Sequence, residues 1–224
     1  MNRTRPRSAV SRQFTGLLNR RLLGPIVGYL QRARLDQFET TGVPPRRIVL
    51  LGERLTEAGN WDEWFPGHPV LNRGNGGDHS ADVLSRLDSA INDPLGVLLL
   101  IGTNDIAAAQ ARDETLANLR EILSEIETRA PGTPVVVQSV MPRGASYADE
   151  VRALNRGYQQ VVAEATTSAR YLDLWPTLAS ADGSLRAELT PDKVHLNGRG
   201  YREWAAVLRP IIEEWSKTCL ESTS

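Results

Sequence analysis

Five short apolar segments constrain the fold of this chain more than any other feature of its sequence. The clearest is residues 96–101, Gly-Val-Leu-Leu-Leu-Ile, in which apolar and polar side chains do not alternate. An uninterrupted apolar run of this length is typical of a strand that is buried on both faces. The other four expected strands are residues 47–51, 70–72, 134–140 and 171–174. We therefore expect a sheet that is covered by helices on both sides.

Segments with helical periodicity separate the expected strands. Apolar side chains recur every three or four residues from Leu116 to Ile126, which predicts a helix with Asp113 as its N-cap and an end near residues 130–134. The other expected helices are residues 80–90 with Ser80 as N-cap, about 147–165, and about 198–215. Strands that alternate with helices predict an α/β fold with a doubly wound parallel sheet, and place the functional site at the carboxyl ends of the strands.

Length, charge and cysteine content exclude several classes of function. The chain has 224 residues, enough for one domain with a sizeable core. Its net charge of −1 gives no overall field that would attract nucleic acid. Its single cysteine, Cys219, cannot form an internal disulfide. No apolar run approaches the roughly 18 residues of a membrane span. We expect no nucleic-acid partner, no membrane span and a cytoplasmic location, with secretion not excluded.

The N-terminal region is basic, because all eight of its arginines precede the first acidic residue, Asp36. The apolar run of residues 22–30 raises two alternatives, a signal peptide and a helix on a membrane surface. Pro25 interrupts the run and no small-x-small cleavage pattern follows it, which favours a frayed tail and then an amphipathic helix through about Phe38. The expected division is a tail and packing helix over residues 1–45, a domain over 46–217 and a C-terminal tail over 218–224.

Four polar segments follow the expected strands. They are residues 52–56 (Gly-Glu-Arg-Leu-Thr), 72–78 (Asn-Arg-Gly-Asn-Gly-Gly-Asp), 102–105 (Gly-Thr-Asn-Asp) and 192–195 (Asp-Lys-Val-His). Loops at the carboxyl ends of parallel strands meet at one edge of the sheet, so these segments are expected to converge on one pocket.

In their order and spacing, these segments resemble the motifs of the SGNH (GDSL-type) hydrolases. That family carries G-D-S-[LI], then a glycine that corresponds to Gly77, then G-x-N-D and D-x-x-H. The resemblance covers about residues 46–209. Residues 141–144 (Met-Pro-Arg-Gly) and 195–201 are most similar to bacterial relatives of the type Ib platelet-activating-factor acetylhydrolase catalytic subunits. The resemblance to the SGNH hydrolases implies a three-layer, flavodoxin-like α/β fold with a five-stranded parallel sheet. It implies neither a metal nor an organic cofactor.

The resemblance also implies a chemistry. In the family, a serine hydroxyl attacks an ester carbonyl, a histidine takes the proton, and an aspartate orients the histidine. By resemblance, His195 is the base and Asp192 its orienting residue. Gly77 and Asn104 are then the donors that stabilise the oxyanion, and losing one such donor typically costs about 3 kcal/mol.

The chain departs from the family pattern at three positions. Arg54 follows Gly52 and Glu53 where the family carries its nucleophilic serine, and arginine stays protonated and cannot form an acyl-enzyme. Asn75 stands where relatives usually have an apolar residue, and His79 where they have threonine or serine. Because the unusual residues cluster while the other motif residues remain, the pattern favours a repurposed site, natural or engineered, over random decay.

Several functions remain open at this point. Arg54 could bind a carboxylate or a developing oxyanion, or it could pair with Glu53 or Asp192 and close the pocket. His79 could serve as a base or nucleophile, or be merely exposed. The chain could be an enzyme that acts on a small ester or related carbonyl compound, a non-catalytic module that binds a small anion, or a subunit of an oligomer such as a homodimer. The enzyme hypothesis is favoured, with Arg54 free, and with Glu53 and Asn75 among the binding residues.

Overall fold

The chain folds around a five-stranded parallel sheet with the strand order β2-β1-β3-β4-β5. The computed structural model describes residues 28–221, and side chains as far as residue 217. The strands are β1 (Ile48–Gly52), β2 (Val70–Gly74), β3 (Gly96–Leu100), β4 (Val135–Gln138) and β5 (Ala169–Leu172). This order is that of flavodoxin-like doubly wound folds, so the predicted fold class is confirmed.

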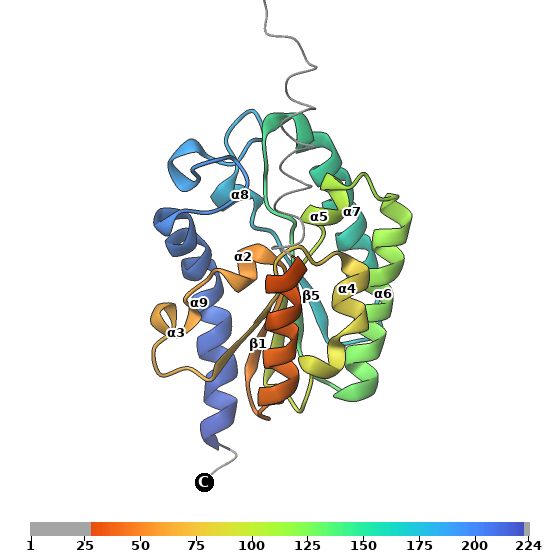
Figure 1. Ribbon diagram of the computed structural model, residues 1–224, viewed down its shortest axis with the longest axis vertical. Coiled ribbons are helices and arrows are strands. Elements are labelled where there is room, and N and C mark those ends of the chain that lie inside the picture. The colour runs from red at the N-terminus through yellow and green to blue at the C-terminus, as the bar shows by residue number, and fades with distance from the viewer. Residues whose placement is uncertain (1–27, 222–224) are drawn as a thin grey trace, which may run out of the picture.

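Helices cover both faces of the sheet (Figure 1). On one face lie α2 (Arg54–Glu57), α3 (Trp61–Trp64) and α9 (Gly198–Glu221), and on the other lie α4 (Ser80–Ser85), α6 (Arg112–Arg129) and α7 (Ala148–Glu164). The shorter elements are α5 (Thr103–Ala107), α8 (Trp175–Leu178) and the 3-10 turns Leu87–Ser89, Ala145–Tyr147 and Ala187–Leu189. No helix among residues 28–221 is both long enough and apolar enough to cross a bilayer.

The two faces explain why the strand sequences do not alternate. Ile48 and Leu50 of β1 belong to the core beneath α9, where Trp204 is fully buried. Val49 and Leu51 belong to the core beneath α4, α6 and α7. Since successive side chains point to opposite faces and both faces are covered, every position of β1 must be apolar.

The ends of some elements differ from the sequence predictions. The fourth strand ends at Gln138 because Val140 donates its N–H to Oδ1 of Asn155 (2.8 Å) and accepts from Nδ2 of the same side chain (3.0 Å). The amide of Asn155 thus takes the place of a neighbouring strand. The last helix continues to Glu221, past the expected end near residue 215, and includes Pro210.

Both predicted N-caps are wrong. Ser80 is the first residue of α4, and its buried hydroxyl donates to Asp105 Oδ1 (2.5 Å) instead of capping the helix. The N-cap is His79, whose N–H donates to Asp82 Oδ2 (2.8 Å). The N-cap of α6 is Ala111, and Asp113 lies in the first turn. A negative charge there still stabilises the helix by interacting with the positive end of its dipole.

A helix over residues 28–41 lies in front of the sheet and contacts β2, which is an edge strand (Figure 1). Its Phe38 is buried, and the guanidiniums of Arg34, Arg73 and Arg86 lie 5.0, 4.5 and 5.9 Å from the centre of the Phe38 ring. The predicted helix that packs on the domain is confirmed. Residues 1–27 lie outside the described part of the chain, and they include most of the 22–30 run on which the signal-peptide and membrane-surface alternatives rest.

We expect Phe38→Ala to lower the free energy of unfolding by about 3 kcal/mol, since it removes a buried ring and leaves a cavity. It also removes the aromatic face from three guanidiniums. Urea unfolding measures the change. Tyr29→Ala, on the same helix but 65% exposed, is the matched control and should change stability by less than about 0.5 kcal/mol. Equal effects of the two substitutions would contradict an anchoring role for Phe38.

Candidate active site

The loop that carries Asp192 and His195 is organised by side-chain caps. Asp192 Oδ1 accepts the N–H groups of Val194 (2.9 Å) and His195 (2.8 Å), and Thr190 Oγ1 accepts the N–H of Lys193 (2.9 Å). Lys193 has a positive φ of 67°, which turns the chain back on itself. This geometry brings His195 Nδ1 to 2.6 Å from Asp192 Oδ2.

The electrostatics of this pair suit a base and its orienting carboxylate. Desolvation acts to raise the pKa of Asp192, but hydrogen bonds from the His195 ring and from the N–H groups of His195 and Val194 lower it to about 2. The carboxylate is therefore ionised at neutral pH and favours the imidazole tautomer with its proton on Nδ1. Because the His195 side chain is 51% exposed, Nε2 is left free to exchange a proton with a ligand or water.

Glu53, the N-cap of α2, is a buried carboxyl. Its side chain accepts the N–H of Leu55 at 3.2 Å, and the residue is 2% exposed. Burial raises the pKa of Glu53 to about 7, against the opposing hydrogen bonds from the N–H groups of Leu55 and Arg54 and the positive charge of Arg143. This carboxyl thus changes charge near neutrality, directly beside residue 54.

Arg54 is the first residue of α2 and is paired, which corrects the expectation of a free side chain. Its Nη1 lies 3.2 Å from Glu57 Oε2, and Arg34 Nε lies 3.5 Å from Glu57 Oε1. The partner is therefore Glu57 and neither Glu53 nor Asp192. Residues three apart share one face of a helix, which explains this choice. The Arg54 side chain remains 44% exposed, so it does not seal the site.

The second polar loop is built around Asp78. Asn75 is buried, donates its N–H to Gly52 O (2.9 Å) and donates Nδ2 to Asp78 Oδ1 (2.6 Å). Asn104 Nδ2 donates to Asp78 O (2.8 Å). An amide group has two N–H bonds, so Asn104 keeps one donor for a ligand. Asn75 acts in this arrangement as support for the loop.

Asp78 forms a buried ion pair with Arg86 Nε at 2.6 Å. Burial raises the pKa of Asp78, and the positive charge and hydrogen bond of Arg86 act against that rise. Arg86 also donates to the carbonyls of Gly52 and Arg73, both at 3.0 Å. This pair therefore ties the ends of β1 and β2 to α4 and fixes the loop above them.

Gly77 has a φ of +88°, a conformation that favours glycine, and it lies under the helix of residues 28–41. A Cβ at Gly77 would collide with the side-chain amide of Gln31. That amide donates to the carbonyl of Gly76. One wall of the predicted oxyanion loop is thus supplied by the N-terminal helix.

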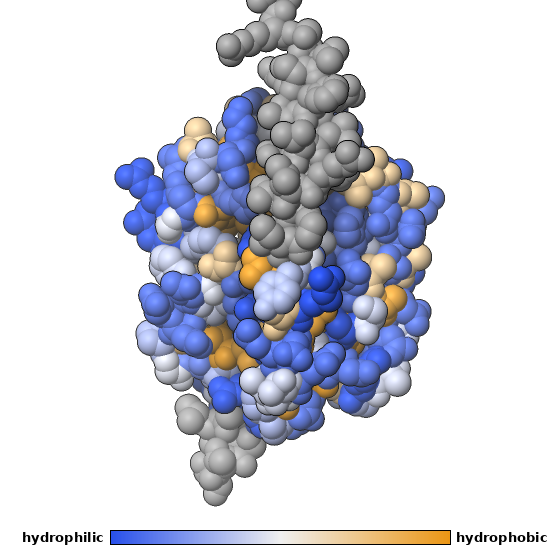
Figure 2. Space-filling model, in the orientation of Figure 1, coloured by the Kyte–Doolittle hydropathy of each residue, from blue (hydrophilic) through white to orange (hydrophobic). Residues whose placement is uncertain are grey.

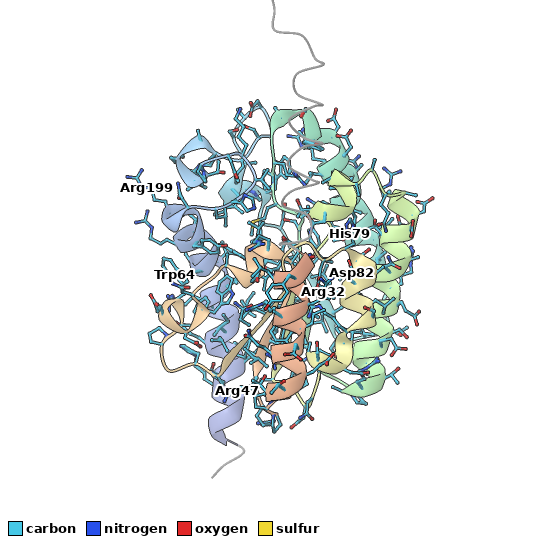
Figure 3. All side chains as sticks on the ribbon, in the orientation of Figure 1. Arg32, Arg47, Trp64, His79, Asp82 and Arg199 are labelled. Atoms are coloured by element: carbon cyan, nitrogen blue, oxygen red, sulfur yellow. The ribbon has the colours of Figure 1, made fainter. Side chains whose placement is uncertain are left out.

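His79 lies at the beginning of α4, on the opposite side of the N-terminal helix from Trp64 and Arg199 (Figure 3). The contacts described for residues 28–217 do not join His195 to Arg54, Gly77, Asn104 or His79. The connection is indirect, because Tyr201 of α9 donates its hydroxyl to Leu55 O at 2.8 Å. The structure thus brings together the members of each motif, and it links the motifs through α2 and α9.

Comparison with known proteins places this arrangement in a family. A sequence profile described as the GDSL-like Lipase/Acylhydrolase family matches residues 38–203. The chain belongs to this family. Platelet-activating factor acetylhydrolase IB subunit alpha1 from Bos taurus and from Homo sapiens are each 27% identical to it over 175 residues, which cover 74% of either sequence.

Solved structures show the same fold as this GDSL-like chain. A protein of Streptococcus pneumonia whose name refers to platelet activating factor has a TM-score of 0.75 at 24% identity and covers 92% of this chain and 100% of its own. A GDSL-like lipase from Bacteroides thetaiotaomicron has a TM-score of 0.69 at 22% identity and covers 82% of this chain and 97% of its own. Within the described residues, no cluster of three or more histidine, cysteine or acidic side chains could hold a metal ion.

Sequence reasoning missed several residues of this GDSL-like site. The pairing of Glu57 with Arg54 could have been predicted, because the two residues are three apart at the beginning of a helix. Arg143 lies in the segment that carried the resemblance, and it donates to Thr103 O at 2.6 Å, which joins the ends of β3 and β4. Gln31 and Arg34 carried no signal, because they reach the site from a helix about 40 residues earlier in the chain.

Proposed function

We propose that this GDSL-type hydrolase scaffold carries a remodelled active site that hydrolyses small esters slowly, with His195 as general base. The observation that supports this proposal is the 2.6 Å contact between His195 Nδ1 and an Asp192 carboxylate that is ionised at neutral pH. Arg54 stands at the position that the motif assigns to the nucleophile, and a guanidinium forms no acyl-enzyme. Water therefore replaces the serine hydroxyl as the attacking group.

In the proposed reaction, His195 Nε2 takes a proton from water as its oxygen attacks the ester carbonyl. The negative charge that develops on the carbonyl oxygen is stabilised by the N–H of Gly77 and by the remaining amide proton of Asn104. The tetrahedral intermediate then expels the alcohol, which receives the proton from His195, and the acid is released. Asp192 stabilises the imidazolium while it carries the proton.

This route predicts slow turnover of a short-chain aryl ester without a burst, and no labelling of residue 54 by a fluorophosphonate. His195→Ala should lower the rate by about 100-fold, the lower end of what a general base contributes. His68→Ala is the matched control, because His68 contacts Ser216 at 2.8 Å on the far half of α9. A burst, or equal rates in the two variants, would overturn the mechanism.

A second candidate function, binding of a small anion without turnover, is favoured by one observation. Among the described side chains, Arg34 and Arg54 share a single carboxylate, Glu57, so within this part of the chain one positive charge between them is not balanced. The proposed ligand is then a carboxylate or phosphate, with Asp192 and His195 as remnants of the ancestral chemistry. Homodimer formation, cytoplasmic location and the division at residues 45 and 217 stay predictions.

A further inference from the structure

A cavity of about 220 Å³ lies between the helix of residues 28–41 and α2. Its lining includes Leu30, Gln31, Arg34, Arg54, Glu57 and Gly76. The face of the molecule that carries this helix is mainly hydrophilic, with small separate apolar areas (Figure 2). Of these lining residues, Arg54 and Gly76 lie in the polar segments that carry the family resemblance, and the other four do not.

Two guanidiniums line this cavity on either side of one carboxylate. Arg54 Nη1 lies 3.2 Å from Glu57 Oε2, and Arg34 Nε lies 3.5 Å from Glu57 Oε1. Each guanidinium has five N–H donors, and Glu57 can satisfy only part of them. The side chains of Arg34 and Arg54 are 24% and 44% exposed, so their remaining donors are accessible to a ligand.

Arg73, which does not line the cavity, lies close enough to the lining residue Arg34 for their positive charges to repel each other. Arg73 is buried and donates to two backbone carbonyls, Ser89 O at 2.8 Å and Gly42 O at 2.5 Å. Burial lowers the pKa of Arg73, and the positive charges of Arg34 and Arg86 lower it further. The carboxylate of Asp78 forms its ion pair with Arg86. None of the ion pairs described for residues 28–217 includes Arg73. An anion in the cavity would relieve this repulsion.

The lining of the cavity suits a ligand with an anionic head and an apolar body. Gly76 is one of its lining residues, and a Cβ there would lie 2.6 Å from Glu57 Oε2 and 2.7 Å from Arg54 Nε. Only glycine therefore lets the Arg54 guanidinium lie against the loop. Leu30, which lines the cavity, is 55% exposed. An apolar side chain beside a pair of guanidiniums matches an aliphatic acid better than a free phosphate.

We propose that this cavity binds the carboxylate of a small aliphatic acid, with Arg34 and Arg54 as its donors and Leu30 against its hydrocarbon part. Planar guanidiniums bind carboxylates through paired hydrogen bonds, and such charge-assisted bonds are the strong ones. The proposal extends the second function above and does not require ester turnover. It makes the N-terminal helix part of the binding site, since that helix supplies Arg34.

The test is calorimetric titration of the full chain with butyrate at low ionic strength. The unchanged chain should bind it, and Arg34→Met and Arg54→Met should each weaken binding by about tenfold or more, the loss expected for a hydrogen bond to a charged group. Arg32→Met is the matched control, because Arg32 is exposed on the same helix and does not line the cavity (Figure 3). It should bind butyrate as the unchanged chain does.

Three outcomes would overturn the proposal: no binding of butyrate by the unchanged chain, equal affinities in Arg32→Met and Arg54→Met, or tighter binding of inorganic phosphate than of butyrate. Arg54→Met keeps the test decisive if Arg34→Met loosens the helix, because Arg54 does not contact the Phe38 ring in the described structure. Butyrate binding without ester turnover would refute the hydrolytic mechanism and leave this site in place.

Discussion

Arg54→Ser is expected to raise the rate of short-chain aryl ester hydrolysis by about 100-fold or more. The expectation is cautious, because removing the nucleophile from an established serine hydrolase costs about a million-fold in turnover. Residue 54 begins α2 immediately after the buried N-cap Glu53, so a serine there would stand where the family motif places it. The Asp192–His195 contact that would activate it is already formed.

The gain should be accompanied by a new chemical signature. A burst of product and covalent labelling by a fluorophosphonate should both arise with the serine, and His195→Ala added to it should abolish both. Arg54→Ala is the control for opening the pocket without adding a nucleophile, and it should stay at the rate of the unchanged chain. Folding should be little affected, since the Arg54–Glu57 pair is partly exposed and such pairs stabilise by less than about 1 kcal/mol.

Loop geometry is the main obstacle to this restoration. Glu53 is one methylene longer than the aspartate of the motif that the chain resembles, and His79 caps α4 at the position where that resemblance leads us to expect threonine or serine. We therefore expect Glu53→Asp and His79→Thr, added to Arg54→Ser, to increase the rate further. A triple variant that folds well and remains inert on a panel of short esters would show that the pocket is not retained.

The strands were predictable because each depends on a local property of the sequence. Residues 96–100 are apolar at every position since both faces of β3 are covered, and that pattern is visible without any tertiary information. The ends were less predictable. The chain leaves β4 after Gln138 because of Asn155, a side chain on another element, and no local pattern reveals that partner.

The same distinction holds for the site. Asp192 and His195 are three residues apart, so their contact follows from a local turn that the motif encodes. The cover that Gln31 gives to Gly77 depends on where an early helix lies along the edge of the sheet. That placement is set by Phe38 and the guanidiniums around its ring, which are distant in sequence.

Glu53 should make the protein less stable as the pH rises from about 5 to 8. Burial raises its pKa from 4.5 in the unfolded chain to about 7 in the folded one. Between these values the folded state holds a proton that the unfolded state has released, so stability falls as the pH increases. A tenfold difference in proton affinity between the two states corresponds to about 1.4 kcal/mol, so the loss is about 3 kcal/mol once the pH exceeds the folded-state pKa.

Glu53→Gln should remove this pH dependence, because the amide does not titrate and its oxygen can still accept the N–H of Leu55. Urea unfolding from about pH 5 to 8.5 measures it, and over that range the variant should gain about 3 kcal/mol relative to the unchanged chain. Asp78 also has a pKa raised by burial, so its contribution to the slope has the same sign and is common to the variant and the unchanged chain. Asp192 contributes in the opposite sense, but only as the pH falls towards its pKa of about 2.

The control for this experiment is Glu121→Gln, at an exposed position on α6, which should leave the slope of stability against pH unchanged. Removing an exposed carboxyl lowers the proton uptake of the folded and unfolded states alike, so the difference that sets the slope is unchanged. Parallel curves for Glu53→Gln and Glu121→Gln would show that the Glu53 carboxyl is ionised throughout. In that case Arg143, whose positive charge already opposes the rise in the pKa of Glu53, or another cation would be stabilising the buried carboxylate in the folded state.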